Sequence, residues 1–183
     1  MKLQKITLSL LILLVVATST WAQTNLLDTD YYSFEGDQKW FVQHRDFWSV
    51  SDEKSATGER SLKFSCEDFS KATGNSVSVQ GVSGKPSPEF IQVKLKPGKY
   101  NMTLKVWLEE KAPVGFGTNL AKPFTPIKWS FKGLEKSKWV TLSQEIEIKE
   151  NTATKMVITV SSNPKWGGAG TFYVDDIALS KVQ

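Results

Sequence analysis

Two adjacent carboxylates, Asp175 and Asp176, interrupt a run of large apolar residues near the end of the chain. The run, 171–179, has the composition of a mostly buried strand, in which charged side chains are not expected. A buried carboxylate normally takes up a proton, pairs with a cation or coordinates a metal ion. A third carboxylate, Glu35, follows an aromatic residue in the segment 33–36. Because calcium prefers hard oxygen ligands, these three side chains predict a calcium site.

Tryptophan is the second residue type with a chemical implication, because the chain contains seven. An exposed indole is a flat apolar platform with an N–H at its edge, and it suits the apolar faces of sugar rings. In the alternating segment 100–108, Trp107 shares the polar parity with Asn101 and Lys105, so these three side chains are candidate sugar ligands. The alternative is that Trp107 lies at a rim and is covered by the following loop. Trp129 shares its parity with apolar neighbours, which predicts core packing.

Two more aromatic residues have glycine neighbours. Trp166 stands in the Pro- and Gly-containing segment 163–168, and Phe116 stands between Gly115 and Gly117. Such segments predict loops, and loops on a rigid scaffold often carry binding residues. Trp166 and Phe116 are therefore predicted to contact a ligand. The alternative is that each aromatic ring packs against the residues of its own loop and stabilises it. For Phe116 this alternative is slightly favoured.

Groups that could perform catalysis are scarce. The single histidine, His44, has charged neighbours, which is typical of a solvated side chain. The single cysteine, Cys66, has no histidine near it in the sequence, and one cysteine excludes an internal disulfide. A glycosidase needs two carboxyl groups that face each other across a cleft, and the acidic residues are better explained as metal ligands or surface charge. The sequence therefore predicts that the protein is not an enzyme.

Strands are the elements that must position these residues. Apolar and polar residues alternate in short segments, which predicts strands with one buried and one solvated face. The predicted strands are 40–48, 61–65, 76–82, 91–95, 100–108, 140–148, 156–160 and 171–179. Short strands separated by Gly, Pro, Asn and Ser predict an all-β, two-sheet antiparallel β-sandwich. Two long connections, 73–88 and 109–126, are predicted to be loops.

The N-terminus has the anatomy of a secretory signal peptide. Lys2 and Lys5 precede an apolar run, and the segment 20–22 that follows offers small side chains, Thr20 and Ala22, at the positions that a signal peptidase reads. The run is shorter than the ~20 residues that a membrane-spanning helix needs. We therefore expect residues 1–22 to be removed, leaving a secreted or periplasmic single domain, 23–183, without a membrane span. Basic residues are scattered among acidic ones, which argues against a nucleic-acid partner.

A series of short motifs follows in a recognisable order. The motifs are 25–27 (NLL), 33–36 (SFEG), Trp40, 58–62 (GERSL), 95–100 (LKPGKY), 138–140 (KWV) and 172–177 (FYVDDI). This series resembles the calcium-binding jelly-roll carbohydrate-binding modules of the galactose-binding-like superfamily, in particular the family 4/9 type. It covers nearly the whole chain after the leader. The resemblance implies a two-sheet jelly roll whose first and last strands are held together by a structural calcium ion.

The resemblance also implies roles for individual residues. Glu35 and Asp175 would supply carboxylate oxygens to the ion, and the turn at Gly58 would supply a main-chain carbonyl. Asp176 could exchange roles with Asp175, and the sequence does not decide between them. Trp139 matches a position that packs the sandwich, as does the tryptophan of the third motif. The sugar would lie elsewhere, on a concave sheet face or at the loop tips.

The residues and the resemblance together predict a secreted, non-catalytic module that binds a polysaccharide or a cell-surface glycan. Two alternatives stay open. The first is a protein-interaction module of the same fold at the cell surface, which a flat apolar loop tip without polar groups would favour. The second is a small polysaccharide lyase or hydrolase, which would need an acidic pair or a cluster of Tyr, Lys and Arg in a groove. The oligomeric state is not predicted.

Overall fold

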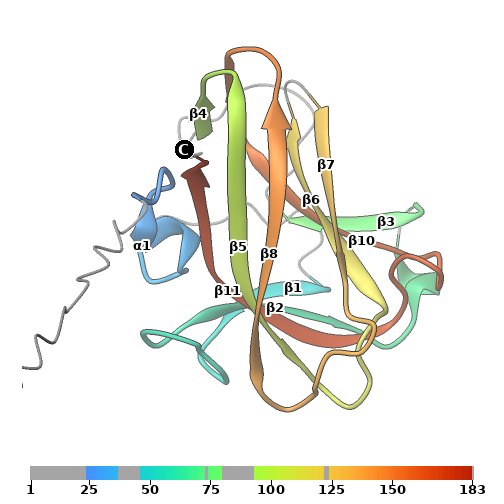
Figure 1. Cartoon of the computed structure of the whole chain (residues 1–183). Coiled ribbons are helices and arrows are strands. Elements are labelled where there is room, and N and C mark those ends of the chain that lie inside the picture. The colour runs from blue at the N-terminus through green and yellow to red at the C-terminus, as the bar shows by residue number, and fades with distance from the viewer. Residues whose placement is uncertain (1–23, 37–45, 73, 80–92, 122–123, 183) are drawn as a thin grey trace, which may run out of the picture.

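Strands make up most of the described chain (Figure 1). The computed structural model describes residues 24–36, 46–72, 74–79, 93–121 and 124–182. The predicted leader and cleavage site, the third-motif tryptophan and the single histidine lie outside these residues. Within them, no helix is both long enough and apolar enough to cross a membrane.

Two short helices and eleven strands are found in this part of the chain. The helices are α1 (Thr29–Tyr32) and the 3-10 helix η1 (Phe69–Lys71). The strands are β1 (Trp48–Ser51), β2 (Ser61–Cys66), β3 (Ser76–Val79), β4 (Val93–Leu95), β5 (Gly98–Leu108), β6 (Gly115–Ala121), β7 (Phe124–Ser130), β8 (Trp139–Ile148), β9 (Thr152–Thr154), β10 (Met156–Ser161) and β11 (Gly170–Lys181).

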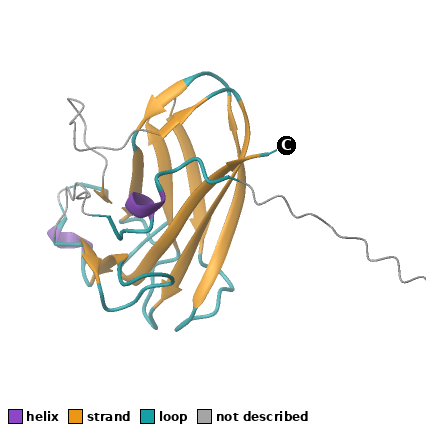
Figure 2. Cartoon of the chain, turned by 90° about the vertical axis from the view of Figure 1, so that its left-hand side faces the viewer, coloured by secondary structure: helices purple, strands orange, loops and turns teal. Residues whose placement is uncertain are grey.

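The strands form a two-layer antiparallel sandwich (Figure 2). A five-stranded sheet has the order β1-β2-β11-β5-β8, and a four-stranded sheet has the order β3-β10-β6-β7. β4 and β9 form a small two-stranded sheet beside them. Neighbouring strands within each sheet pair in antiparallel register. The predicted all-β sandwich is therefore confirmed.

The core lies between the two sheets, and alternation along the strands fills it. In β5, every second residue from Tyr100 to Leu108 is buried, as the sequence pattern predicts. Phe172 of β11 lies at the centre of an aromatic cluster that contains Phe64 of β2 and Phe116 of β6. Burial of such rings is the main favourable term that holds the two layers together.

The segment 109–126 differs from its prediction. Instead of one long loop, it contains β6 and the start of β7, which pair with each other. Gly115 permits close approach of the two strands, because a Cβ atom there would lie 2.2 Å from the carbonyl oxygen of Trp129. Pro126 is tolerated because β7 is the edge strand of its sheet. Glycine and proline therefore have structural roles inside strands here, which the sequence pattern hid.

The beginning of the described chain packs against its end. The Leu26 amide donates a hydrogen bond of 2.7 Å to the Leu179 carbonyl, and the Leu179 amide donates one of 3.0 Å to the Asn25 side chain. The short helix α1 follows, capped by the Asp28 carboxylate. These contacts bring Glu35 and the aspartates in the middle of β11 to the same side of the sandwich.

Candidate functional site

A hollow of ≈ 430 Å³ lies on the outer face of the four-stranded sheet. Strand alternation explains its lining: Phe116, Thr118 and Leu120 of β6 are buried in the core, so the intervening residues face outward. The outward-facing polar residues of the lining are Asn119 of β6, Lys128 and Ser130 of β7, and Thr159 and Ser161 of β10. The hollow therefore combines these polar side chains with a larger apolar surface, to which the exposed Val114 and Trp166 contribute.

Glycine keeps the floor of the hollow open. Gly117 lies in β6 opposite Lys128 of β7 and Thr159 of β10. A Cβ atom at Gly117 would come no closer than 3.5 Å to its nearest neighbour, the Thr159 methyl group. A small side chain would thus fit without a clash, but it would fill space that is now open to a ligand.

Trp166 forms the aromatic wall and is 59% exposed. It lies in the loop between β10 and β11, which a tight turn closes. The Trp166 and Gly167 amides both donate hydrogen bonds of 2.9 Å to the Asn163 carbonyl. Gly167 packs against Ser161 so closely that a Cβ atom would lie 2.2 Å from the Ser161 carbonyl oxygen. The Val114 amide also donates to the Gly167 carbonyl, so the indole is displayed on a well-anchored loop.

Two lysines border this wall. The Lys128 ammonium lies over the Trp166 ring, 4.4 Å from its centroid, in a cation–π contact. Lys165 precedes Trp166 and also lines the hollow. The lining contains no aspartate or glutamate. The hollow can therefore stack an apolar ring face, donate hydrogen bonds and attract negative charge.

The sequence predicted that Phe116 lies on a loop tip, and this prediction is wrong. It lies in β6, is only 3% exposed, and stacks against Trp129 of β7 at a centroid distance of 6.3 Å. Trp129 is buried as predicted, and its indole N–H donates a hydrogen bond of 3.0 Å to the hydroxyl of Thr118. These two rings support the floor of the hollow from the core side.

Trp107 lies on the other sheet. It is half-buried on the outer face of β5, opposite Trp139 of β8, and the two rings meet edge to face at 6.1 Å. Its indole N–H donates to the Glu109 carboxylate at 3.1 Å, and the Lys54 ammonium covers the ring at 4.6 Å. Trp139 therefore lies on the outside of the sandwich, not in its core as the resemblance implied. The platform at Trp107 is partly covered by the protein itself.

The two polar residues grouped with Trp107 already have partners. Lys105 forms an ion pair of 2.8 Å with Asp176, and the Asn101 carbonyl oxygen accepts a hydrogen bond of 2.7 Å from the Ser143 hydroxyl. The structure thus separates the predicted sugar ligands into two groups on different sheets. Trp107, Lys105 and Asn101 belong to the five-stranded sheet. Trp166 and Phe116 belong to the region of the hollow.

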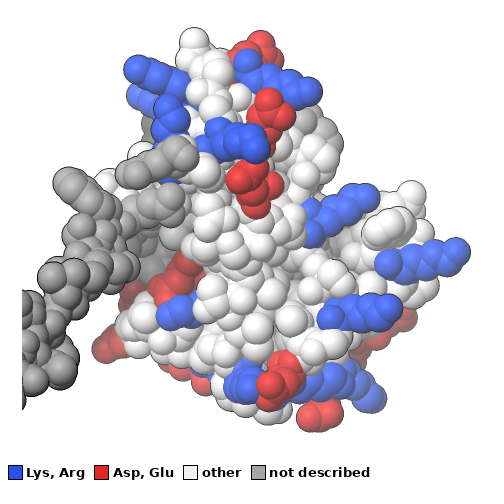
Figure 3. Space-filling model, in the orientation of Figure 1, with Lys and Arg blue, Asp and Glu red and all other residues white. Residues whose placement is uncertain are grey.

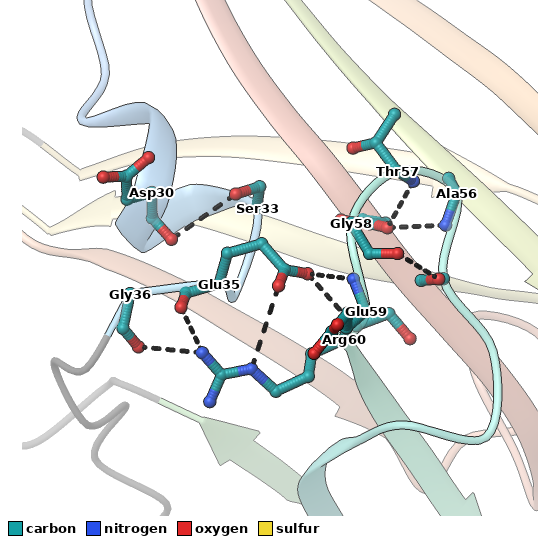
Figure 4. Close-up of polar contacts among 12 residues, drawn as sticks. Asp30, Ser33, Glu35, Gly36, Ala56, Thr57, Gly58, Glu59 and Arg60 are labelled. Carbon is teal, nitrogen blue, oxygen red and sulfur yellow. Dashed lines mark hydrogen bonds and ion pairs between the residues drawn. The ribbon is translucent and has the colours of Figure 1, made fainter.

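The predicted metal ligands come together around the turn between β1 and β2. Figure 4 shows Glu35 beside this turn, where its carboxylate accepts hydrogen bonds from the amides of Glu59 (2.9 Å) and Arg60 (2.7 Å). The Arg60 guanidinium donates to the main-chain carbonyls of Glu35 and Gly36. Gly58 has φ +65°, and a Cβ atom there would lie 2.5 Å from Cδ of Glu35. Glycine is therefore required for the carboxylate to fit against the turn.

Asp175 is buried beneath the turn between β1 and β2, and a β-bulge directly after it turns Asp176 away from the core. The register of β11 with β5 shifts between Asp175 and Ala178, and Asp176 has φ +49°. Asp175 is 0% exposed and accepts hydrogen bonds of 2.7 Å from the amides of Ala56 and Asp176. Asp176 turns outward and accepts a hydrogen bond from the Thr57 hydroxyl.

The surroundings of Asp175 leave its charge poorly compensated. Burial raises the pKa of its carboxyl from 3.8 to about 6, although the amide donors oppose this shift. Lys105 pairs with Asp176 instead. In the described part of the chain, no three Asp, Glu, His or Cys side chains are grouped as they would be around a metal ion. An ion here would need main-chain oxygens, such as the carbonyl of Gly58, in addition to Glu35 and Asp175.

Sequence reasoning missed the polar lining of the hollow. Asn119, Lys128 and Thr159 lie on three strands that are adjacent only in the folded sheet. Alternation along each strand could have shown that these side chains face outward, because Lys128 is next to the buried Trp129 and Thr159 is next to the buried Ile158. Placing both on one surface requires the pairing of β10 with β6, which the sequence does not encode locally.

The two-layer antiparallel sandwich is the fold of known carbohydrate-binding modules. One such structure is the CBM22-1 xylan-binding domain from Paenibacillus barcinonensis Xyn10C, with a TM-score of 0.51 and 16% sequence identity over 88% of this chain and 97% of that domain. The CBM22-1-CBM22-2 tandem domain of the same protein matches with a TM-score of 0.51 and 17% identity, over 91% of this chain and 49% of the tandem.

A third structure, the CBM22-1-GH10 modules of Clostridium thermocellum Xyn10B, has a TM-score of 0.50 and 14% identity, over 87% of this chain and 29% of that one. No protein-family model and no curated protein matches the sequence. At these identities the likeness establishes the shared fold. It does not confirm the family 4/9 type, since these neighbours carry the family 22 name.

Proposed function

We propose that this protein is a non-catalytic carbohydrate-binding module that holds a polysaccharide in the hollow on the four-stranded sheet. The observation that carries the proposal is the exposed indole of Trp166 beside outward-facing polar side chains of the four-stranded sheet. Stacking on the indole would bind the apolar face of a sugar ring, and the side chain of Asn119 would bind its hydroxyl groups. The fold supports this proposal, because structural neighbours include a domain described as xylan-binding.

The lining of the hollow argues against hydrolysis at this site. Glycoside hydrolysis requires a pair of carboxyl groups about 5–10 Å apart, and the residues that line the hollow include no carboxylate. The polar residues around Trp166 also argue against a flat, purely apolar contact surface for a protein. Binding of a glycan without cleavage is therefore the function that these side chains support best.

Affinity electrophoresis and calorimetry with a panel of soluble polysaccharides test the proposal. We expect Trp166→Ala to abolish retention by the bound polymer and to leave the melting temperature nearly unchanged, because the indole is exposed. Trp107→Ala is the matched variant on the other sheet, and we expect it to retain binding. Loss of binding in Trp107→Ala together with full binding in Trp166→Ala would move the site to the five-stranded sheet, with Lys105 and Asn101 as its polar groups.

Three finer features belong to the proposal. The protein is exported after removal of residues 1–22, and the mass of the mature form would then correspond to a chain that begins at Gln23. It belongs to the family 4/9 type named by the motif series. A structural calcium ion is bound by Glu35, Asp175 and the carbonyl of Gly58, and it supplies the positive charge that buried Asp175 otherwise lacks.

A further inference from the structure

We propose that the polysaccharide bound in this hollow is acidic: its sugars carry an anionic substituent, either a carboxylate of a uronic acid or a sulfate ester. This inference rests on the proposed function and specifies its ligand class. The shared chemistry is a negative group at the edge of a sugar ring that stacks on Trp166.

The distribution of charge is the first observation. β3, β6, β7 and β10 contain no aspartate or glutamate, and the residues that line the hollow include two lysines and no acid. The chain as a whole is nearly balanced, with 23 basic and 19 acidic residues, so the excess of positive charge is local. Figure 3 shows basic side chains on the right-hand side of the molecule, the side on which the four-stranded sheet lies in Figure 1, with acidic side chains below them. Because the lining of the hollow carries positive charge and no negative charge, it attracts an anionic ligand.

The second observation is that the lysines of the hollow have no carboxylate partner among the described residues. Elsewhere in the described chain, six lysines form ion pairs with acids, namely Lys54, Lys63, Lys99, Lys105, Lys136 and Lys138, and others, such as Lys94 and Lys132, form none with a described residue. Lys128 instead lies over the indole of Trp166, 4.4 Å from the ring centroid. An exposed cation–π contact is weaker than a charge-assisted hydrogen bond to an anion. An anionic sugar can therefore draw this ammonium from the ring and free the indole for stacking.

A neutral polysaccharide would bind in the hollow more weakly than an acidic one. Sugar hydroxyls donate hydrogen bonds as well as accept them, and protein carboxylates are strong acceptors for such donors. The hollow offers only weaker neutral acceptors, such as Asn119, Thr159 and Ser161. A neutral ligand would also displace water from the Lys128 ammonium without supplying a counter-charge, which is unfavourable. An acidic sugar supplies that charge directly.

The test compares polymers by calorimetry at equal chain concentration: polygalacturonate and glucuronoxylan carry carboxylates, a carrageenan carries sulfate esters, and unsubstituted xylan and mixed-linkage glucan are neutral. We expect binding of at least one acidic class and much weaker binding of the neutral chains. Lys128→Gln should lower the affinity for the acidic polymer about tenfold or more. Lys99→Gln, a lysine variant on the five-stranded sheet, is the matched control and should have no effect.

Each outcome has a defined meaning. Preference for the carboxylated or for the sulfated polymer identifies the anionic group. Tight binding of a neutral chain that depends on Trp166 and not on Lys128 would overturn the acidic ligand but leave the proposed function intact. Binding of acidic polymer that survives Trp166→Ala and disappears between ~0.1 M and ~1 M salt would be non-specific ion exchange, and it would overturn the inference. Failure to bind any polysaccharide would overturn both.

Discussion

Asp175 is a single carboxylate at which burial and hydrogen bonding compete. Amides of Ala56 and Asp176 donate to its oxygens, which favours the ionised form, while complete removal from solvent favours the protonated form. Burial is the larger effect and raises the pKa to about 6. The ionised form is therefore the costly one in the folded protein when no cation is bound.

This balance predicts how stability changes with pH in the presence of a chelator. The pKa of Asp175 rises from 3.8 in the unfolded chain to about 6 in the fold, so the folded state binds more protons between these values. Its contribution is complete at low pH and is lost as the pH rises through about 6, with a slope of at most about 1.4 kcal/mol per pH unit. Urea unfolding of the wild type and Asp175→Asn checks this, because the variant lacks the titrating group. A difference between the two that does not change with pH would contradict it.

Among the tryptophans, the indoles differ mainly in what covers them. Trp166 is covered on one face by a flexible lysine that a ligand can displace. Trp107 is held by Glu109, by Lys54 and by the ring of Trp139. Both residues were candidate platforms from the sequence, and only the folded surroundings separate them.

At the scale of elements, the turn between β1 and β2 organises the carboxylates. Its amides bind Glu35 from the N-terminal segment and Asp175 from β11. Two segments that are distant in the sequence thus meet at one turn. The turn requires Gly58 because its backbone has φ +65° and its Cα faces the Glu35 side chain.

We expect Gly58→Ala to destabilise the fold more than a comparable glycine substitution elsewhere. Strain at a positive φ costs about 1–3 kcal/mol, and the clash with Glu35 adds to it. Gly133→Ala is the matched control, because Gly133 has φ +78° and a Cβ atom there would meet nothing within 4 Å. Urea unfolding gives both free energies. Equal losses in the two variants would show that the contact with Glu35 contributes nothing.

At the scale of the whole molecule, the first described residues lie beside the last strand. Leu26 bonds to β11, and Glu35 bonds to the turn that covers Asp175. A calcium ion bound by both Glu35 and Asp175 would hold the N-terminal segment and β11 together more strongly, without any further burial of apolar side chains.

Chelation tests the proposed ion. At a calcium concentration ~100 times the dissociation constant, binding would stabilise the fold by ~2.7 kcal/mol, so chelation should lower the melting temperature by several degrees. Glu35→Ala should abolish this sensitivity. Glu59→Ala, which removes an exposed acid on the same turn, should keep it. If chelation leaves the wild-type melting curve unchanged, amide donors and Arg60 hold Glu35 without a metal ion.

The class of fold could be predicted from the sequence, because alternation with period two is a local property of each strand. The burial of β5 and of Trp129 followed directly from that alternation. The resemblance of the motif series to the family implied that Glu35, Gly58 and Asp175 lie close together, and the structure places them around one turn. These features depend on residue type and on order along the chain.

The tertiary structure alone decided the site. Glycine and proline suggested a loop at 109–126, yet Gly115 and Pro126 serve a close strand pair and a sheet edge. The turn between β1 and β2 buries Asp175 on the outer face of β11, and the bulge that follows turns Asp176 away from the core, since one shift in register exchanges the two faces of a strand. The hollow exists because pairing of β10, β6 and β7 brings Thr159, Asn119 and Lys128 onto one surface. Non-local pairing is set by the packing of the whole core, so no single segment of sequence reveals it.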